Sequence, residues 1–353
     1  MFKKLIIITK LMLIVFIVSS CTKNNREKAS VKNTKLQKKV VKKVRKVEFT
    51  LKFSHVVSDD TPKGKAAKFF KKRLEELSNG RIDVQIYPNS ELYKDNVVLN
   101  AVKEGSIQMA CPSFSKFRDI VPQLALFDLP FLFRDMNHIH KVQDSEIGKK
   151  LKKMVENQGF TVLDFWDNGF KQMTSSKRAL LLPEDAKGQK FRIMNSEVLK
   201  AQFKVLEAES EVMPFSKVYK ALKNGLIDGQ ENTISNIYTK NFYKVQKYLT
   251  LTNHGYLGYL VVMNKDFYNS LPQELKKAVK QAMSEATEKE RTYAGDLEII
   301  QLNLIKKSAE IDIFELSPEQ TEKWRNAVKG IYEQFYDDKK IGKKLIQAVA
   351  DLR

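Results

Sequence analysis

From about residue 47 onward, the apolar positions of the chain change between a period of two and a helical period. Apolar residues at every second position from Val47 to Phe53 predict a β-strand. The segment 60–62, Asp-Thr-Pro, supplies a capping oxygen and a proline for the start of a helix, which Asn-Gly at 79–80 ends. Strands and helices that alternate in this way are typical of a mostly parallel sheet covered on both faces. The predicted elements are a strand over 47–53, a helix over 62–78, a strand over 82–86, a helix over 95–104 and a strand over 107–111.

A seven-residue segment of this region has a counterpart later in the chain. Residues 101–107 read AVKEGSI, and residues 221–227 read ALKNGLI. In each, we expect a helix to end at a glycine, Gly105 or Gly225, because glycine takes the left-handed conformation of a helix C-cap. Two similar α/β lobes would produce this repeat, and chance is the alternative.

Two later apolar segments predict strands that could connect such lobes. Residues 160–166 read as a buried strand followed by a turn at 167–169, and residues 256–264 read as a second strand. We interpret the pair as a hinge. Residues 273–308 have a helical pattern with no proline and a single glycine, Gly295. A helix of this length could extend along both lobes.

The first 20 residues have the pattern of a secretory signal peptide. Lys3 and Lys4 precede an apolar segment over 5–18, which Lys10 interrupts and which is too short for a comfortable membrane-spanning helix. Val-Ser-Ser-Cys at the end of this segment resembles the bacterial lipobox, in which the cysteine, here Cys21, is lipidated. A plain signal peptide with an incidental cysteine is the alternative.

The net charge of +20 first suggests a nucleic-acid partner, but its distribution argues against one. Residues 1–46 hold 14 of the 62 Lys and Arg residues and one acidic residue, Glu27. The rest of the chain has 48 basic and 41 acidic residues with both signs interspersed, as on a solvated surface. Residues 21–46 have almost no large apolar side chains before Val40, which predicts a basic, flexible tether. The tether could lie along an anionic bilayer or act only as a spacer.

Motifs of nucleotide binding and catalysis are absent from the sequence, which contains no G-x-G-x-x-G, G-x-x-x-x-G-K-[ST] or G-x-S-x-G. Among four histidines only His138 and His140 are close, and their spacing on a helix turns them apart, so we expect no shared metal. Cys111 has no partner if Cys21 is acylated, and we expect it to be a small buried residue. The sequence therefore indicates neither an enzyme nor a cofactor.

Three polar motifs follow one another in the second half of the chain. Residues 183–192 read PEDAKGQKFR, residues 215–219 read FSKVY and residues 228–232 read DGQEN. In order and spacing they resemble the P-x-D-x-x-G-x-K-x-R, F-S-x-x-Y and D-G-x-E-N motifs of TRAP-type (tripartite ATP-independent periplasmic) solute-binding proteins, and the likeness covers about residues 47–340. The segments that look most like the C4-dicarboxylate, DctP-type branch are 53–57, 61–65 and 248–254.

The resemblance implies an α/β fold of two lobes, the type II-like periplasmic-binding-protein fold, with a long cross-lobe helix. It also implies extracytoplasmic capture of succinate, malate or fumarate and its delivery to a membrane permease driven by a sodium gradient. The alternatives that stay open are a sialic acid or a 2-oxo monocarboxylate as the ligand, and a ligand-sensing surface lipoprotein. The expected parts are a lipoprotein signal peptide over 1–20, a tether over 21–46, lobe I over 47–168 and 257–300, and lobe II over 169–256 and 301–353.

Two basic residues are the first candidates for a ligand-binding site. Arg192 matches the family's carboxylate-binding arginine, whose planar guanidinium fits a carboxylate through two charge-assisted hydrogen bonds. Taken alone, Arg192 could be a surface arginine paired with Glu184 or another surface acid. Lys171 falls where many family members have a second arginine or a lysine, and it would meet another ligand oxygen as a point charge. A solvated lysine after the predicted turn is the alternative.

Uncharged and lower-ranked candidates complete the predicted site. Asn232 can donate and accept hydrogen bonds toward a ligand, and it could also cap a helix that starts near Thr233. Phe215 matches a family position that packs on the ligand, although alone it would read as a core residue. Ser113 follows the first repeated segment, where the family contacts the ligand from the other lobe. Two further candidates lie near the carboxyl end of the first strand, where α/β proteins bind ligands: His55 and Lys63.

Overall fold

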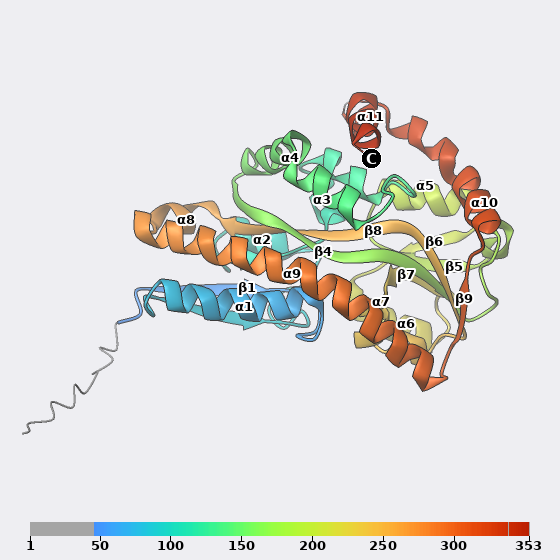
Figure 1. The fold of residues 1–353 in the computed structure, drawn as a ribbon, viewed down its shortest axis with the longest axis horizontal. Coiled ribbons are helices and arrows are strands. Elements are labelled where there is room, and N and C mark those ends of the chain that lie inside the picture. Colours follow the sequence, from blue (N-terminus) through green and yellow to red (C-terminus); the bar gives the residue numbers. More distant parts are fainter. Residues whose placement is uncertain (1–45, 338, 353) are drawn as a thin grey trace, which may run out of the picture. The chain divides into compact units, whose positions relative to one another are not determined.

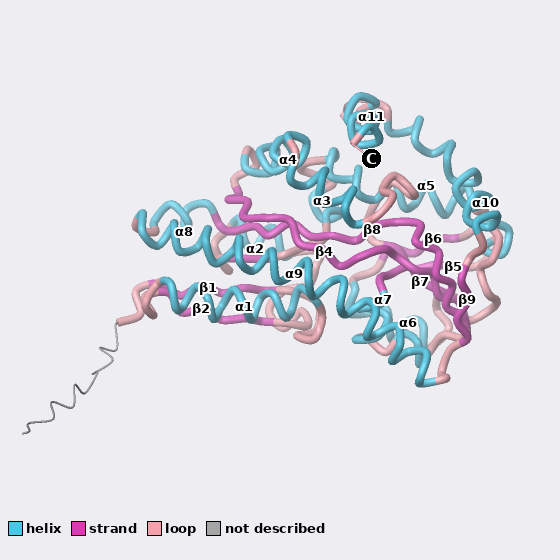
Figure 2. Tube along the Cα trace, in the orientation of Figure 1, coloured by secondary structure: helices cyan, strands magenta, loops and turns pink. Residues whose placement is uncertain are grey.

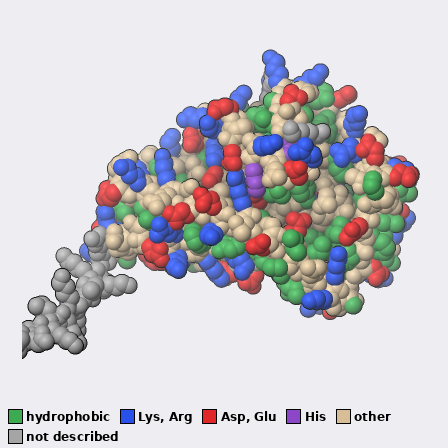
Figure 3. Space-filling view, in the orientation of Figure 1, with side chains coloured by type: hydrophobic (Ala, Val, Ile, Leu, Met, Phe, Trp, Pro, Cys, Tyr) green, Lys and Arg blue, Asp and Glu red, His purple; other side chains and the backbone are tan. Residues whose placement is uncertain are grey.

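The computed structural model describes residues 46–337 and 339–352. The predicted signal peptide, the lipidation candidate Cys21 and residues 22–45 of the tether lie outside the described residues. Within the described ranges, no helix is both long and apolar enough to cross a membrane. Basic and acidic side chains are interspersed on the face shown in Figure 3, as on a solvated surface.

A single mixed sheet of nine strands runs through the part of the chain that the structure describes, in the order β2-β1-β3-β8-β4-β7-β5-β6, with β9 paired to β8. The strands β1, β2 and β3 pair in parallel, as do β5, β6 and β7. The two central strands, β4 and β8, are antiparallel, so the expectation of a mostly parallel sheet holds only for its two ends. The strands are β1 (Phe49–Ser54), β2 (Ile82–Tyr87), β3 (Met109–Ala110), β4 (Phe160–Ser175), β5 (Lys190–Ile193), β6 (Glu209–Val212), β7 (Gly229–Thr233), β8 (Tyr248–Asn264) and β9 (Asp312–Glu315).

Helices connect and cover these strands (Figures 1 and 2). The first helix begins as predicted, because the Thr61 side chain accepts a hydrogen bond from the Gly64 N–H and Pro62 occupies the first turn. The helices are α1 (Pro62–Leu77), α2 (Val98–Lys103), α3 (Met136–Asp144), α4 (Glu146–Glu156), α5 (Glu197–Val205), α6 (Val218–Lys223), α7 (Ile234–Thr239), α8 (Lys265–Ser270), α9 (Gln273–Ser308), α10 (Pro318–Lys329) and α11 (Lys343–Asp351). The 3-10 helices are η1 (Phe114–Phe117), η2 (Pro122–Asp128), η3 (Pro183–Ala186), η4 (Phe215–Lys217), η5 (Phe242–Lys244) and η6 (Gly330–Phe335).

The predicted turn at residues 167–169 is wrong, because β4 continues through it to Ser175. The strand keeps its pairing with β8 on both sides, and the register shifts between Asp167 and Gly169 and again between Lys171 and Met173. Gly169 has a φ of +123°, which the bulged strand requires and which side chains with a Cβ rarely adopt. The Asp-Asn-Gly segment therefore bends a strand and does not reverse the chain.

The two long strands β4 and β8 have other strands beside them at each end, so the sheet has two halves. In the first half, which holds β1, β2 and β3, β3 pairs with the carboxyl end of β8. In the second half, which holds β5, β6 and β7, β7 pairs with residues 171–175 of β4. The helix predicted over 273–308 is α9, which packs on α1 in the first half and on α7 in the second (Figure 1). Two strands and one helix thus connect the halves, and the hinge predicted from the sequence stays a prediction.

Separate apolar clusters stabilise the two halves. Leu51, Phe53 and Phe70 pack with Trp166 in the first half, and Val218, Ile234 and Leu249 pack together in the second. The C-terminal residues return to the first half, because Ile331, Phe335, Ile346 and Val349 belong to the same cluster as Phe117, Phe127 and Leu151. The lobe boundaries drawn from the sequence stay a prediction. They assign residues 301–353 wholly to lobe II, whereas these four C-terminal residues pack in the first half.

Candidate ligand-binding site

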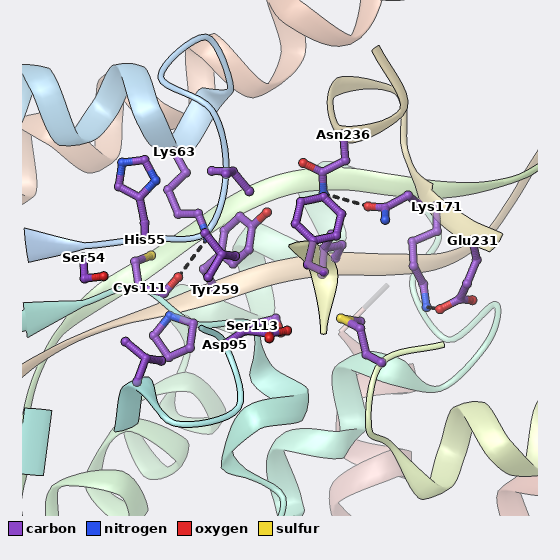
Figure 4. A pocket seen from close by; sticks show the side chains of 18 of the residues that line it. Ser54, His55, Lys63, Asp95, Cys111, Ser113, Lys171, Glu231, Asn236 and Tyr259 are labelled. Atoms are coloured by element: carbon purple, nitrogen blue, oxygen red, sulfur yellow. Dashed lines mark hydrogen bonds and ion pairs between the residues drawn. The ribbon is translucent and has the colours of Figure 1, made fainter. Parts of the chain in front are cut away.

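A cavity of about 590 Å³, including its opening to solvent, lies between the two halves of the sheet (Figure 4). The first half contributes the carboxyl end of β1, the start of α1 and the loop after β3. The second half contributes β5, η4, β7 and α7. The cavity is lined by all seven residues predicted from the sequence to bind the ligand: His55, Lys63, Ser113, Lys171, Arg192, Phe215 and Asn232.

Arg192 is a buried cation with no carboxylate partner among the described residues. It lies on β5, its side chain is 2% exposed, and its Nε and Nη2 donate hydrogen bonds to the Met213 carbonyl at 3.2 and 3.0 Å. The alternative of a surface ion pair with Glu184 is therefore wrong. Burial lowers the pKa of Arg192, but a guanidinium stays protonated in proteins, so the cavity wall holds a positive charge.

The second basic candidate, Lys171, forms a buried ion pair. Its Nζ lies 2.6 Å from Oε1 of Glu231, and both side chains are 1% exposed. The other carboxylate oxygen of Glu231 accepts a hydrogen bond from Nε2 of His254 at 2.8 Å. Burial alone would raise the pKa of Glu231, but the Lys171 charge and the His254 hydrogen bond lower it to about 2. The alternative of a solvated lysine is wrong, and the role of Lys171 toward a ligand stays a prediction, since Glu231 already balances its charge.

Local packing explains how this ion pair fits into the strands. Gly255 on β8 is the neighbour of Lys171, and a Cβ at Gly255 would lie 2.6 Å from the Lys171 Cε. A side chain there would therefore displace the stem of the lysine. A Cβ at Gly229, in the D-G-x-E-N motif, would likewise clash with the ring of Phe191. The absence of a side chain at Gly229 allows β7 to pair with β5.

Asn232 and Asn236 form a connected pair of amides beside this ion pair. The Asn232 Oδ1 accepts from the Asn236 Nδ2 at 2.7 Å and from the Thr233 N–H at 3.2 Å. The Asn232 Nδ2 donates to none of the described residues, so it can donate to a ligand. The N-cap of α7 is Thr233, whose hydroxyl accepts a hydrogen bond from the Asn236 N–H. The alternative that Asn232 caps this helix is therefore wrong.

Lys63 is the cation of the first half. Its Nζ donates to the Cys111 carbonyl at 2.9 Å and lies 3.4 Å from the centre of the Tyr259 ring. Burial lowers the pKa of the Lys63 ammonium to about 8. Cys111 itself is a free, buried cysteine, as predicted, and burial raises the pKa of its thiol.

His55, Ser54 and Ser113 supply uncharged polar groups near Lys63. Both ring nitrogens of His55 and the Ser54 hydroxyl are buried and have no hydrogen-bond partner within residues 46–337 and 339–352. Burial lowers the pKa of His55 to about 3, so its ring is neutral at neutral pH. The Ser113 hydroxyl lies 3.2 Å from that of Ser115. Buried polar groups without a partner call for one, and a ligand or water in the cavity would provide it.

Several residues that line the cavity or contact its lining were not predicted from the sequence. Glu231 was visible only as part of the D-G-x-E-N motif, and His254 only as the end of the segment 248–254. Tyr259 and Asn236 carry no local signal, because a tyrosine in an apolar strand and an asparagine in a helix both read as structural residues. Their place in the site depends on contacts between distant parts of the chain.

The two close histidines have different partners in the structure. The Nε2 of His138 lies 2.9 Å from the Val349 carbonyl oxygen, and the Nε2 of His140 lies 2.6 Å from Oδ2 of Asp167. No group of three or more potential metal ligands occurs among the described residues. The two histidines thus contact different parts of the chain, Val349 and Asp167.

The comparisons with known proteins agree with one another. The family model for bacterial extracellular solute-binding proteins, family 7 (DctP), matches residues 53–339. The C4-dicarboxylate-binding periplasmic protein DctP of Shewanella loihica is 44% identical over 302 residues, which cover 84% of this chain and 88% of that protein. The protein of the same name from Rhodobacter capsulatus is 42% identical over 300 residues, or 85% of this chain and 89% of the relative.

A solved structure extends this likeness to three dimensions. A TRAP periplasmic solute-binding protein from Sulfurospirillum deleyianum, crystallised with bound succinate, is 52% identical and superposes with a TM-score of 0.85 over 87% of this chain and all of that one. These findings confirm the predicted TRAP-type family and the two-lobed α/β fold. They also confirm a solute-binding component of transport rather than an enzyme, and an extracytoplasmic location. The chain belongs to family 7 of the bacterial extracellular solute-binding proteins, the DctP family.

Proposed function

We propose that this protein captures a C4-dicarboxylate, namely succinate, malate or fumarate, in the cavity between its lobes and delivers it to a TRAP membrane permease. The observation that carries the proposal is Arg192, a buried guanidinium that lines the cavity and has no carboxylate partner among the described residues. The two DctP relatives are described as C4-dicarboxylate-binding, and the Sulfurospirillum structure holds succinate, which supports the same ligand class here.

A dicarboxylate suits this cavity because polar groups lie on both of its sides. Arg192 and the Asn232 amide, on the second half of the sheet, would bind one carboxylate through charge-assisted hydrogen bonds. Lys63, His55 and Ser54, on the first half, would bind the other. A ligand held from both halves stabilises the closed arrangement and so links binding to closure.

The ligand class can be tested with a thermal-shift panel on the purified mature chain. We expect succinate, malate and fumarate to raise the melting temperature, because a ligand that binds only the folded state stabilises it by mass action. Acetate is the matched control with one carboxylate. A shift with a sialic acid or a 2-oxo monocarboxylate, and none with the C4-dicarboxylates, would replace the proposed ligand.

We further propose that Cys21 carries a lipid that anchors the protein to a membrane. The support is the sequence Val-Ser-Ser-Cys after an apolar segment, followed by a basic stretch. An acyl chain contributes about 0.8 kcal/mol for each buried methylene group, so a diacylglyceride would hold the chain at the bilayer. Expression of Cys21→Ala tests this: the wild type should fractionate with membranes and the variant should not. Equal fractionation of the two would show that the anchor is absent.

A further inference from the structure

An ion pair outside the cavity, called the rim pair, joins the segments that follow two of its lining residues, Ser113 and Arg192. Nη1 of Arg118 lies 3.2 Å from Oε1 of Glu197, and their side chains are 28% and 64% exposed. Arg118 directly follows η1, five residues after the cavity residue Ser113. Glu197 begins α5, five residues after Arg192. The two partners of this ion pair, the rim pair, are thus placed by the two segments that flank the site.

Each member of the rim pair also has a partner on its own side. Nε of Arg118 lies 3.1 Å from Oδ1 of Asp119, and Nζ of Lys200 lies 2.9 Å from Oε1 of Glu197. Four charges of alternating sign therefore cross the rim. If the sides move apart, Arg118 keeps Asp119 and Glu197 keeps Lys200, so neither charge is left without an opposite neighbour. Breaking the rim pair therefore leaves no charge in this row without an opposite neighbour.

Other contacts show that the two sides meet along this rim. The Ser115 hydroxyl lies 3.6 Å from the Met194 sulfur, next to the rim pair. At a second place, Nζ of Lys240, which follows α7, donates to Oδ1 of Asn89, which follows β2, at 2.9 Å. The rim pair is the only one of these three contacts that joins opposite charges, and therefore the one that salt should weaken.

We propose that Arg118 and Glu197 hold the cleft closed over the bound solute and so set how slowly the solute leaves. This proposal rests on the proposed function for the identity of the solute, but not for the closure itself. Both are positioning residues, since neither lines the cavity. Exposed ion pairs contribute little, so removal of the rim pair should raise the dissociation rate only about 1.5- to 5-fold and leave the association rate unchanged.

A double-mutant cycle in stopped-flow measurements of succinate release tests this. We expect Arg118→Gln and Glu197→Gln each to speed the release of succinate. The double variant should release succinate no faster than the faster of the two single variants. The exchange Arg118→Glu with Glu197→Arg should restore part of the slow release. In about 1 M salt, where the Debye length is about 3 Å, the differences should vanish. The matched control is Lys149→Gln, which removes the exposed Lys149–Glu146 ion pair on α4. Release rates that stay unchanged in the variants, or effects of the two single substitutions that add strictly in the double variant, would overturn the proposal.

A second measurement separates the rim pair from the identity of the ligand. Dyes attached at Leu92→Cys and Val205→Cys, both at exposed positions of opposite sides, report closure by single-molecule energy transfer. Cys111 is buried and should not be labelled. We expect Arg118→Gln to shorten the dwell time of the closed state even without ligand. Unchanged dwell times would overturn the rim-pair proposal, whereas absence of succinate binding by the wild type would count against the proposed function alone.

Discussion

Lys171 and Glu231 form a buried ion pair in the wall of the cavity, and His254 completes the set of partners of the carboxylate. Taking either partner away leaves a buried charge unpaired, which costs about 3–5 kcal/mol. We therefore expect Glu231→Gln to lower the free energy of unfolding by about this amount in urea titrations of the ligand-free protein. The double variant Lys171→Met with Glu231→Gln should be more stable than Glu231→Gln alone.

An exposed ion pair provides the control for this prediction. Glu319 and Lys323 on α10 lie 2.8 Å apart with side chains 78% and 54% exposed. Glu319→Gln should change the free energy of unfolding by less than about 0.5 kcal/mol. Equal losses for Glu231→Gln and Glu319→Gln would contradict the account of a buried, mutually dependent pair.

We expect the lowered pKa of Lys63 to make ligand binding depend on pH. With a pKa of about 8, the ammonium is charged below pH 8 and becomes neutral above it. A bound dianion favours the charged form and raises this pKa, so the complex takes up a proton when it forms above pH 8. Affinity for succinate should thus be highest below pH 8 and fall by at most about tenfold per pH unit above it.

Calorimetry in two buffers of different ionisation enthalpy measures this proton uptake directly. Lys63→Met, which keeps the length of the side chain without the charge, should abolish the uptake and flatten the pH dependence between pH 7 and 9. Proton uptake that persists in Lys63→Met would assign the dependence to another group.

At the residue level, the sequence predicted which side chains gather in one cavity but not how their charges are balanced. Arg192, Asn232 and Phe215 belong to motifs whose order and spacing are specific. The partner of Lys171 could not be predicted, because Glu231 reaches it through the pairing of β7 with β4, sixty residues apart. Pairing between distant strands leaves no trace in local patterns.

At the level of elements, Gly169 marks the place where β4 passes from one half of the sheet to the other. Its φ of +123° would strain any residue with a Cβ, by about 1–3 kcal/mol. Space is not the obstacle, since the atom nearest to where an alanine methyl group would lie is the Glu298 carboxylate oxygen, at 3.6 Å. We expect Gly169→Ala to destabilise the protein by this amount in thermal or urea unfolding.

Gly295 is the matched control, because it lies inside α9 with no atom within 4 Å of its Cβ position. Gly295→Ala should stabilise the chain by about 0.5–1 kcal/mol, since alanine favours helix over the unfolded state. If both substitutions changed the free energy of unfolding in the same direction, backbone strain at residue 169 would not explain the effect of Gly169→Ala.

The segments around these two glycines show how well the sequence pattern predicted whole helices and strands. The helix over 273–308 was predicted with both ends correct, because a long run without proline has few alternatives. The turn at 167–169 was wrong, because Asp-Asn-Gly is equally compatible with a turn and with a bulge. Only the continuous pairing of β4 with β8 decides between them.

At the level of the whole molecule, the cavity is built by both halves of the sheet, and polar groups of both halves line it. β4, β8 and α9 connect the halves, while the rim pair and the Lys240–Asn89 contact meet across the opening. A ligand can shift the equilibrium toward the closed form only by binding it more tightly than the open form. Contacts from both halves to one ligand would provide that difference.

Calorimetric titration of succinate into the wild type and into Arg192→Ala tests the central claim, with Arg192→Lys as the variant that keeps the charge without the guanidinium fork. We expect saturable 1:1 binding by the wild type. Truncation of a buried charge partner costs about 2–5 kcal/mol, so Arg192→Ala should weaken binding by about 30- to 4,000-fold, with Arg192→Lys between the two. Unliganded melting temperatures show that each variant is folded. Wild-type affinity in a folded Arg192→Ala protein would contradict the account.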